Sequence, residues 1–160
     1  MRPGMSLRSV MPLLVLTIAS GSLRAAAPLR DGDIIFHTSR SAQSVAIQRA
    51  THSPWSHMGV ILIRDGMRGA AGTYAGKPYD LYFEWSDARI YCSELVWKMY
   101  RDALGIEVGA RQKLREFDLS DPAVKAKMRE RYGSHVPLNE PVISPGAMYD
   151  SPLLESIVTH

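Results

Sequence analysis

The chain of 160 residues contains one cysteine, Cys92, and its setting favours a chemical role for the thiol. The residues after it have helical spacing as far as Leu104, so Cys92 stands in the first turn of a predicted helix. There, unpaired backbone N–H groups and the positive end of the helix dipole favour the thiolate, the nucleophilic form of cysteine. A cysteine on an apolar helix is usually a small core residue, however, and spacing alone leaves both interpretations open.

A cysteine hydrolase also needs a base to take up the thiol proton, and the chain offers five histidines. His57 differs from the others because it begins an apolar segment and is followed by Met58 and Gly59. A glycine in a strand lets another element approach closely, so His57 could face the start of a helix. We therefore predict His57 as the base, although a histidine in such a position is more often structural.

Metals, cofactors and nucleic acid are not expected. One cysteine cannot build a structural zinc site, and His52 and His57 do not have a zinc-ligand spacing. The formal charge of +3 falls to +1 without Arg2 and Arg8, and nucleic-acid binding would require clustered basic residues. The charged residues 125–131 are expected to form the solvated face of a helix.

Residues 1–27 predict a signal peptide. Two arginines precede the apolar residues 10–19, which are too few to span a bilayer, and small residues then place cleavage after Gly21 or Ala27. The pattern indicates a bacterial protein that is periplasmic or secreted; an uncleaved anchor helix is the alternative. In an oxidising compartment a lone exposed thiol is at risk of oxidation, which favours a functional thiol.

Residues 28–160 are long enough for one domain with a modest core. The predicted class is α+β, with a small antiparallel sheet packed against helices. The tail from Pro137 is rich in proline and is expected to run extended over the surface. Strands are expected at residues 33–36 and 56–63, the second central and buried, and helices at 41–51, 67–76, 92–104 and 122–133.

Several segments occur together in a specific order. They are residues 32–36, 50–60, 76–80 and 91–97, followed by 114–119 and 142–146. In this order they resemble the YiiX-type permuted papain-like hydrolases, which are circularly permuted relatives of the NlpC-type cell-wall cysteine peptidases. The resemblance covers nearly all of residues 28–160, and the ordered set is more specific than any one of its motifs.

The resemblance implies a permuted papain-like fold in which the histidine strand precedes the cysteine helix. It implies Cys92 as nucleophile and His57 as base, with backbone N–H groups at the helix start as oxyanion donors. Tyr91 and Ser93 are then candidate residues of the oxyanion pocket, and a packing role for Tyr91 is equally open. Asp33 belongs to a Gly-Asp motif and is expected to be a structural turn residue.

One departure from the family pattern concerns the group that orients the histidine. In the family, the next strand carries a polar residue, typically Glu, for this purpose. Here Asp65 leads almost directly into the 67–76 segment, and no acidic residue occurs between Asp65 and Asp80. Nothing in the spacing requires Asp80 or Glu84 to reach the imidazole. We expect a sheet that lacks one or more strands, with a weaker histidine base.

Three functions remain open at this point. The first is an exported cysteine amidase or peptidase that acts on cell-wall peptides or related amides. The second uses the same dyad on lipid acyl esters or thioesters, because lecithin–retinol acyltransferase-like enzymes share the permuted order. An apolar slot beside Cys92 would favour the second, and a polar groove the first. The third is a catalytically impaired binding or vestigial domain. No integral membrane span is expected once the signal is removed, and no pattern sets an oligomeric state.

Overall fold

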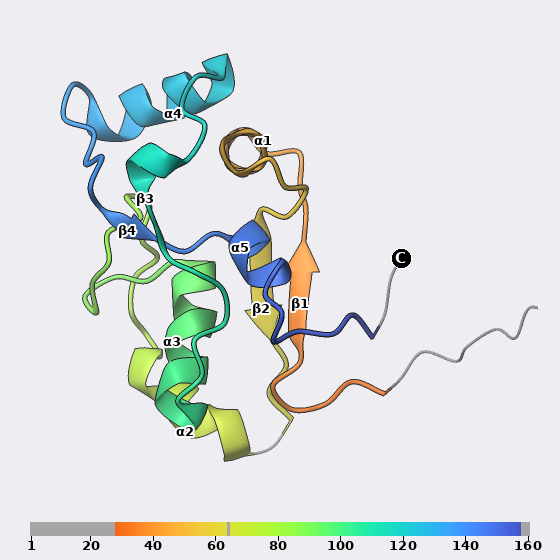
Figure 1. Cartoon of the computed structure of the whole chain (residues 1–160). Helices are drawn as coiled ribbons and strands as arrows, with labels where there is room; N and C mark the ends of the chain where they lie inside the picture. Colours follow the sequence, from red (N-terminus) through yellow and green to blue (C-terminus); the bar gives the residue numbers. More distant parts are fainter. Residues whose placement is uncertain (1–27, 64, 158–160) are drawn as a thin grey trace, which may run out of the picture.

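The computed structural model describes residues 28–63 and 65–157 (Figure 1). The predicted signal peptide lies outside these residues. In chain order the elements are β1 (Ile34–His37), α1 (Ala42–Thr51), β2 (His57–Val60), α2 (Asp65–Tyr74), α3 (Cys92–Leu104), β3 (Gln112–Lys113), the 3-10 helix η1 (Leu114–Glu116), α4 (Pro122–Tyr132), β4 (Pro141–Val142) and α5 (Pro145–Tyr149). The strands form two antiparallel pairs, β1–β2 and β3–β4, which confirms the predicted α+β class. Among the residues that the structure describes, none of the helices has the length and hydropathy of a membrane-spanning segment.

The β1–β2 ribbon carries the predicted base at one end. Its register places Ile34 opposite Val60 and His37 opposite His57, and α3 packs against β2 (Figure 1). Asp33, just before β1, accepts a hydrogen bond from the backbone N–H of Arg30 at 2.7 Å, as expected of a turn residue.

The prediction of a central buried strand over residues 56–63 is wrong. Strand β2 ends at Val60, Gly59 is exposed, and Ile63 is 51% exposed. The reason is that β2 pairs only with β1 in the part of the chain that the structure describes. After β2 the chain enters α2, which packs against α3 through Met67 and Tyr74. A further strand beside β2 is therefore missing from the described residues, as the sequence predicts.

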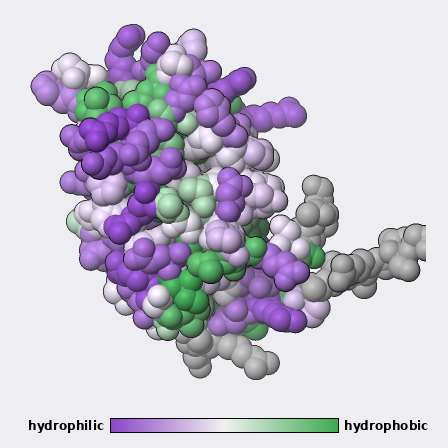
Figure 2. Space-filling view, in the orientation of Figure 1, coloured by the Kyte–Doolittle hydropathy of each residue, from purple (hydrophilic) through white to green (hydrophobic). Residues whose placement is uncertain are grey.

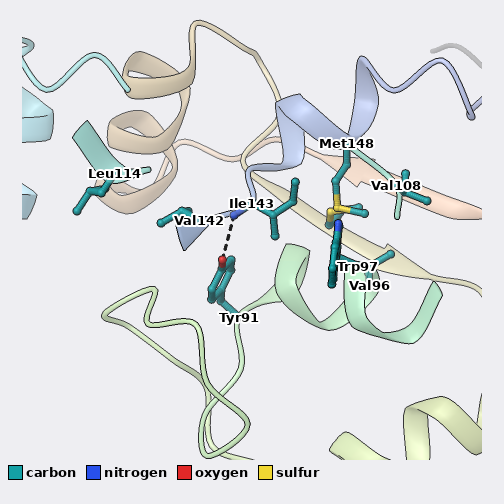
Figure 3. Close-up of a cluster of buried hydrophobic side chains, with 9 residues drawn as sticks. Tyr91, Val96, Trp97, Val108, Leu114, Val142, Ile143 and Met148 are labelled. Atoms are coloured by element: carbon teal, nitrogen blue, oxygen red, sulfur yellow. Dashed lines mark hydrogen bonds between the residues drawn. The ribbon is translucent and has the colours of Figure 1, made fainter. Parts of the chain in front are cut away.

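The tail forms part of the core, so the prediction of an extended surface segment is wrong. Strand β4 and helix α5 bring Ile143 and Met148 against Trp97 of α3 in the main hydrophobic cluster (Figure 3). Prolines are compatible with these elements because Pro141 begins a short strand and Pro145 stands at the first position of a helix.

Two aromatic clusters lie in different parts of the molecule. Beside α3, the guanidinium of Arg111 lies 4.9 Å from the ring centre of Trp85 and 4.7 Å from that of Trp97. Beside β1, Trp55 packs against Tyr149 of α5, with ring centres 5.0 Å apart, and against Phe36 at 5.9 Å. The first cluster holds the loop before α3, and the second joins the ribbon to the tail.

Candidate active site

Cys92 is the first residue of α3, and the residues on either side of it hold the helix start in place. The backbone N–H of Ile143 donates to the Tyr91 hydroxyl at 3.1 Å (Figure 3), and the Ser93 hydroxyl donates to the carbonyl of Ile143 at 2.8 Å. Both side chains that the sequence suggests for the oxyanion pocket therefore bind the tail. Their role in binding an oxyanion stays a prediction. Because the Ser93 hydroxyl donates to Ile143, the donor that Ser93 has left for an oxyanion is its backbone N–H.

The Cys92 thiol lies among several hydrogen-bond donors. The backbone N–H groups of Met58 and Ser93 and the hydroxyl of Tyr79 lower its pKa. Burial has the larger effect, however, and raises the pKa of Cys92 above its ordinary value. Desolvation thus opposes the thiolate that the helix start is predicted to favour, and the raised pKa favours the neutral thiol.

His57, the first residue of β2, also lies in surroundings that favour its neutral form. Burial lowers the pKa of His57, and the neighbouring His37 lowers it further. Its Nε2 lies 3.1 Å from Oγ of Ser44 in α1. In the tautomer whose Nε2–H donates to the Ser44 hydroxyl, the unprotonated Nδ1 can accept a proton from another group. The neutral imidazole suits a general base in that tautomer.

Strand β2 connects the two predicted catalytic residues. Met58, which follows His57 in the strand, directs its backbone N–H to the Cys92 sulfur, so His57 and Cys92 lie at the same junction of β2 and α3. No hydrogen bond joins the His57 ring to the thiol among the described residues. The catalytic pairing of the two therefore stays a prediction.

The side chain that contacts the His57 ring through a hydrogen bond is Ser44. Its side chain is fully buried, and its Oγ accepts a hydrogen bond from the Ser41 hydroxyl at 3.0 Å in addition to its contact with His57. Asp80 does not substitute for it, because its carboxylate accepts the backbone N–H groups of Tyr82, at 2.8 Å, and Glu84, at 2.5 Å. A serine network at the start of α1 thus holds the imidazole.

Sequence reasoning missed three residues near the thiol and the imidazole: Ser44, Tyr79 and Gln43. The Tyr79 hydroxyl interacts with both the Cys92 thiol and the Gln43 side chain. Tyr79 belongs to the 76–80 segment that carries the resemblance, which was a usable signal. The serines before residue 45 indicated only a helix cap, and nothing in their spacing pointed to His57.

A cavity of about 70 Å³ opens beside Cys92, between α1, α4 and the start of α3. Its walls are almost wholly apolar. Cys92, Tyr91 and Ser93 line it, and so do Lys127 and Arg131 of α4. The expectation that residues 125–131 form only a solvated face is wrong for these two, because α4 packs across α1. Figure 2 shows hydrophilic residues over the upper part of the molecule, where α4 lies. The apolar members of the wall include Ala46, Ile47, Phe83, Leu114, Val124, Met128, Val142 and Ile143.

Comparison with known proteins supports the resemblance. YiiX of Escherichia coli strain K12, an uncharacterized protein, is 41% identical over 189 residues that cover 91% of this chain and 94% of that protein. A crystal structure titled metalloprotein yiiX, from E. coli O157:H7, matches with a TM-score of 0.78 and 42% identity, over 82% of this chain and 97% of that one. The aligned span of 189 residues is longer than this chain, so the relative has a stretch without a counterpart here.

The word metalloprotein describes that relative. In the described ranges of this chain, no three His, Cys, Asp or Glu side chains come together to hold a metal ion. The family model of the permuted papain-like amidase enzymes, YaeF/YiiX, C92 family, matches residues 67–158, which include Cys92. With this match over more than half of its length and a close relative over nearly all of it, the chain belongs to the permuted papain-like amidase family.

Proposed function

We propose that this protein is a cysteine amidase that cleaves acyl amides, with related esters as alternative substrates, and that Cys92 attacks the acyl carbon. Family membership supports hydrolase chemistry of this type. The observation that carries the choice of substrate is the apolar cavity, because Cys92 itself lines it. Export, as predicted from residues 1–27, is part of the proposal.

The cavity distinguishes between the substrates that the sequence left open. A cell-wall peptide would bring several amide groups that lose their hydrogen bonds to water when they enter an apolar cavity. An acyl chain has no such groups. The volume of about 70 Å³ provides space for roughly five water-sized groups, which suits a short acyl chain.

The resting protonation states define the first step. Cys92 begins as a thiol and His57 as a neutral imidazole, so His57 takes the thiol proton as the sulfur attacks the carbonyl carbon. The carbonyl oxygen becomes an oxyanion beside the N–H groups of Met58 and Ser93, which face the sulfur. Burial raises the pKa of Tyr79 to about 12, so its hydroxyl keeps its proton at neutral pH and acts as a further donor.

The remaining steps return the enzyme to its starting state. The carbon–nitrogen bond breaks, His57 gives its proton to the leaving amine, and an acyl thioester remains on Cys92. His57 then takes a proton from water as the water attacks the thioester. When the carbon–sulfur bond breaks, the acid leaves and the proton returns to the thiol, so that no external acid or base is consumed.

A substrate panel tests this function on the full chain. We expect turnover of butyryl p-nitroanilide and p-nitrophenyl butyrate, weaker turnover of longer acyl chains, and none of a γ-glutamyl cell-wall peptide. Cys92→Ala should abolish turnover, and mass spectrometry should detect a butyryl group on Cys92 in the wild type. Full activity in Cys92→Ala would contradict the proposal. A folded protein without turnover or acyl-enzyme on the whole panel would instead support a catalytically impaired binding domain.

A further inference from the structure

One face of α4 forms a wall of the cavity beside Cys92. Val124, Lys127, Met128 and Arg131 are three, four and seven residues apart, the spacing of one helix face, and all four line the cavity. Because almost none of the wall is polar, Lys127 and Arg131 line the cavity mainly with their apolar stems. Their charged ends are therefore carried beside the apolar cavity and do not form its surface.

The two cations differ in whether their charge is paired. The ammonium of Lys127 lies 2.6 Å from the carboxylate of Glu130, so its charge is balanced locally. The guanidinium of Arg131 lies over the ring of Phe83, 4.9 Å from its centre. In the described part of the chain Arg131 forms no ion pair or hydrogen bond, and no Asp or Glu lines the cavity. The charge of Arg131 acts on Glu130, but that carboxylate is exposed and already paired with Lys127. A half-buried cation without an ion pair of its own favours a ligand that supplies an anion.

Arg131 also lies near the nucleophile. Burial raises the pKa of the Tyr79 hydroxyl, and the charge of Arg131 acts in the opposite direction. The same hydroxyl interacts with the Cys92 thiol. In addition, Phe83, beneath the guanidinium, packs edge-on against Tyr91, the residue before Cys92, with ring centres 5.2 Å apart. A ligand that reaches Cys92 therefore comes within the influence of the Arg131 charge.

We propose that Arg131 binds an anionic group of the substrate, a carboxylate or a phosphate, while the apolar part of the acyl group fills the cavity. This inference rests on the proposed function and narrows its substrate class to acyl compounds that carry a negative charge. Arginine suits the task because its planar guanidinium can donate two parallel hydrogen bonds to either kind of anion.

Two alkylating reagents of different charge test the inference on the full chain. Iodoacetate carries a carboxylate and iodoacetamide is neutral, and both report on Cys92 alone because it is the single cysteine. The rate with iodoacetate is divided by the rate with iodoacetamide, for Cys92 and for a free thiol. The first quotient divided by the second measures how much the site prefers an anionic reagent. We expect a preference of roughly tenfold, which corresponds to about 1.4 kcal/mol, and it should decrease with added salt.

Variants of α4 identify the residue responsible. Arg131→Gln should reduce the preference to about one, and Arg131→Lys should retain part of it. Arg129→Gln is the matched control, because Arg129 is exposed on the same helix and does not line the cavity. An unchanged preference in Arg131→Gln, or an equal loss in Arg129→Gln, overturns the inference.

Protection experiments distinguish the two anions and separate the inference from the proposed function. Butyrate and butyl phosphate are compared with neutral butyramide as protectants of Cys92 against iodoacetamide. The anion that protects better than butyramide in the wild type, but not in Arg131→Gln, identifies the group. If neither does so while butyryl p-nitroanilide is still turned over, the inference fails and the proposed function stands. If no variant reacts with either reagent or any substrate, both fail.

Discussion

Cys92 and His57 are positioned by two regions that differ in how deeply their side chains are buried. Helix α3 buries Val96, Trp97 and Met99 almost completely, and its start is tied to Ile143 of the tail. The histidine lies on a ribbon of two four-residue strands whose Ile35 is 45% exposed. Cys92 is thus fixed by the hydrophobic core, whereas His57 depends on a thin ribbon and one hydrogen bond to Ser44.

This difference teaches which property each region controls. Side chains around α3 contribute buried apolar area, so changes there should alter the free energy of unfolding. His57 and the Ser44 hydroxyl that it contacts contribute little apolar area to the core, so changes to these two residues should alter catalysis while the fold survives. Four substitutions test this division, and their expected effects decrease in the order given.

His57→Ala should have the largest effect, a loss of about a thousandfold in kcat for butyryl p-nitroanilide, because the thiol loses its base. The melting temperature should change little, since His57 is only partly buried. His135→Ala, which removes an exposed histidine, is the control and should leave both quantities unchanged. Unfolding of His57→Ala at room temperature would show that the ribbon is as important to stability as the core.

Trp97→Ala should lower the free energy of unfolding by about 3–4 kcal/mol, because it leaves a cavity in the main cluster and removes the stacking of Arg111. Ile35→Ala, in the ribbon, should cost less than about 1 kcal/mol because its side chain is already half exposed. Urea unfolding followed by circular dichroism measures both. Equal losses in the two variants would remove the contrast between the regions.

Glu94→Gln tests a pH dependence that belongs to the cysteine region. Burial raises the pKa of Glu94 to about 7 from 4.5, against the hydrogen bond and charge of Lys98, whose ammonium lies 2.8 Å from Glu94 Oε1. The folded state therefore keeps this proton at pH values where the unfolded state has lost it. This contribution to stability is complete below pH 4.5 and is lost as the pH rises to about 7.

The expected decline is on the order of 2 kcal/mol between pH 4.5 and 7 in the wild type, reduced from the full shift because the pair is coupled. Glu94→Gln should show a smaller decline over that range, and Lys98 keeps Asp87 at 2.7 Å as a partner. Urea midpoints at several pH values provide the measurement. Parallel curves for the two proteins would mean that the pKa of Glu94 is the same in the folded and unfolded states.

Ser44→Ala should have the smallest effect, a loss of roughly five- to tenfold in kcat, because the imidazole loses the hydroxyl that holds it. The pH at which kcat reaches half its maximum should also move, which a change in packing alone would not produce. Ser39→Ala, in the same serine network but not bonded to His57, serves as the control. A lower kcat with an unmoved pH profile would assign Ser44 a packing role.

The parts of the fold that local signals define could be predicted from the sequence. Helix α3 begins and ends where expected because the apolar spacing starts after Tyr91, and Gly105 closes the helix in a left-handed conformation. The family followed from several motifs in order. The length of β2 was not predictable. Strand β2 is shorter than expected because it pairs with one strand in the described residues, and hydrophobic periodicity does not reveal how many neighbouring strands a strand has.

The features that depend on packing between distant segments could not be predicted. The proline-rich tail gave no sign that Ile143 would be held between Tyr91 and Ser93. The role of Arg131 depends on α4 crossing α1, and a charged helix face is usually solvated. The raised pKa of Cys92 follows from burial, whereas the sequence revealed only its place at a helix start.

The two aromatic clusters give each region its own fluorophore. Trp55 reports on the ribbon and tail, and Trp85 and Trp97 report on the loop before α3 and on α3 itself. These are the three tryptophans of the chain, so Trp55→Phe confines the emission to the cysteine region. In a denaturant titration, the difference between this variant and the wild type would follow the contact between the ribbon and the tail. The order in which the two regions melt can therefore be observed without attaching a dye.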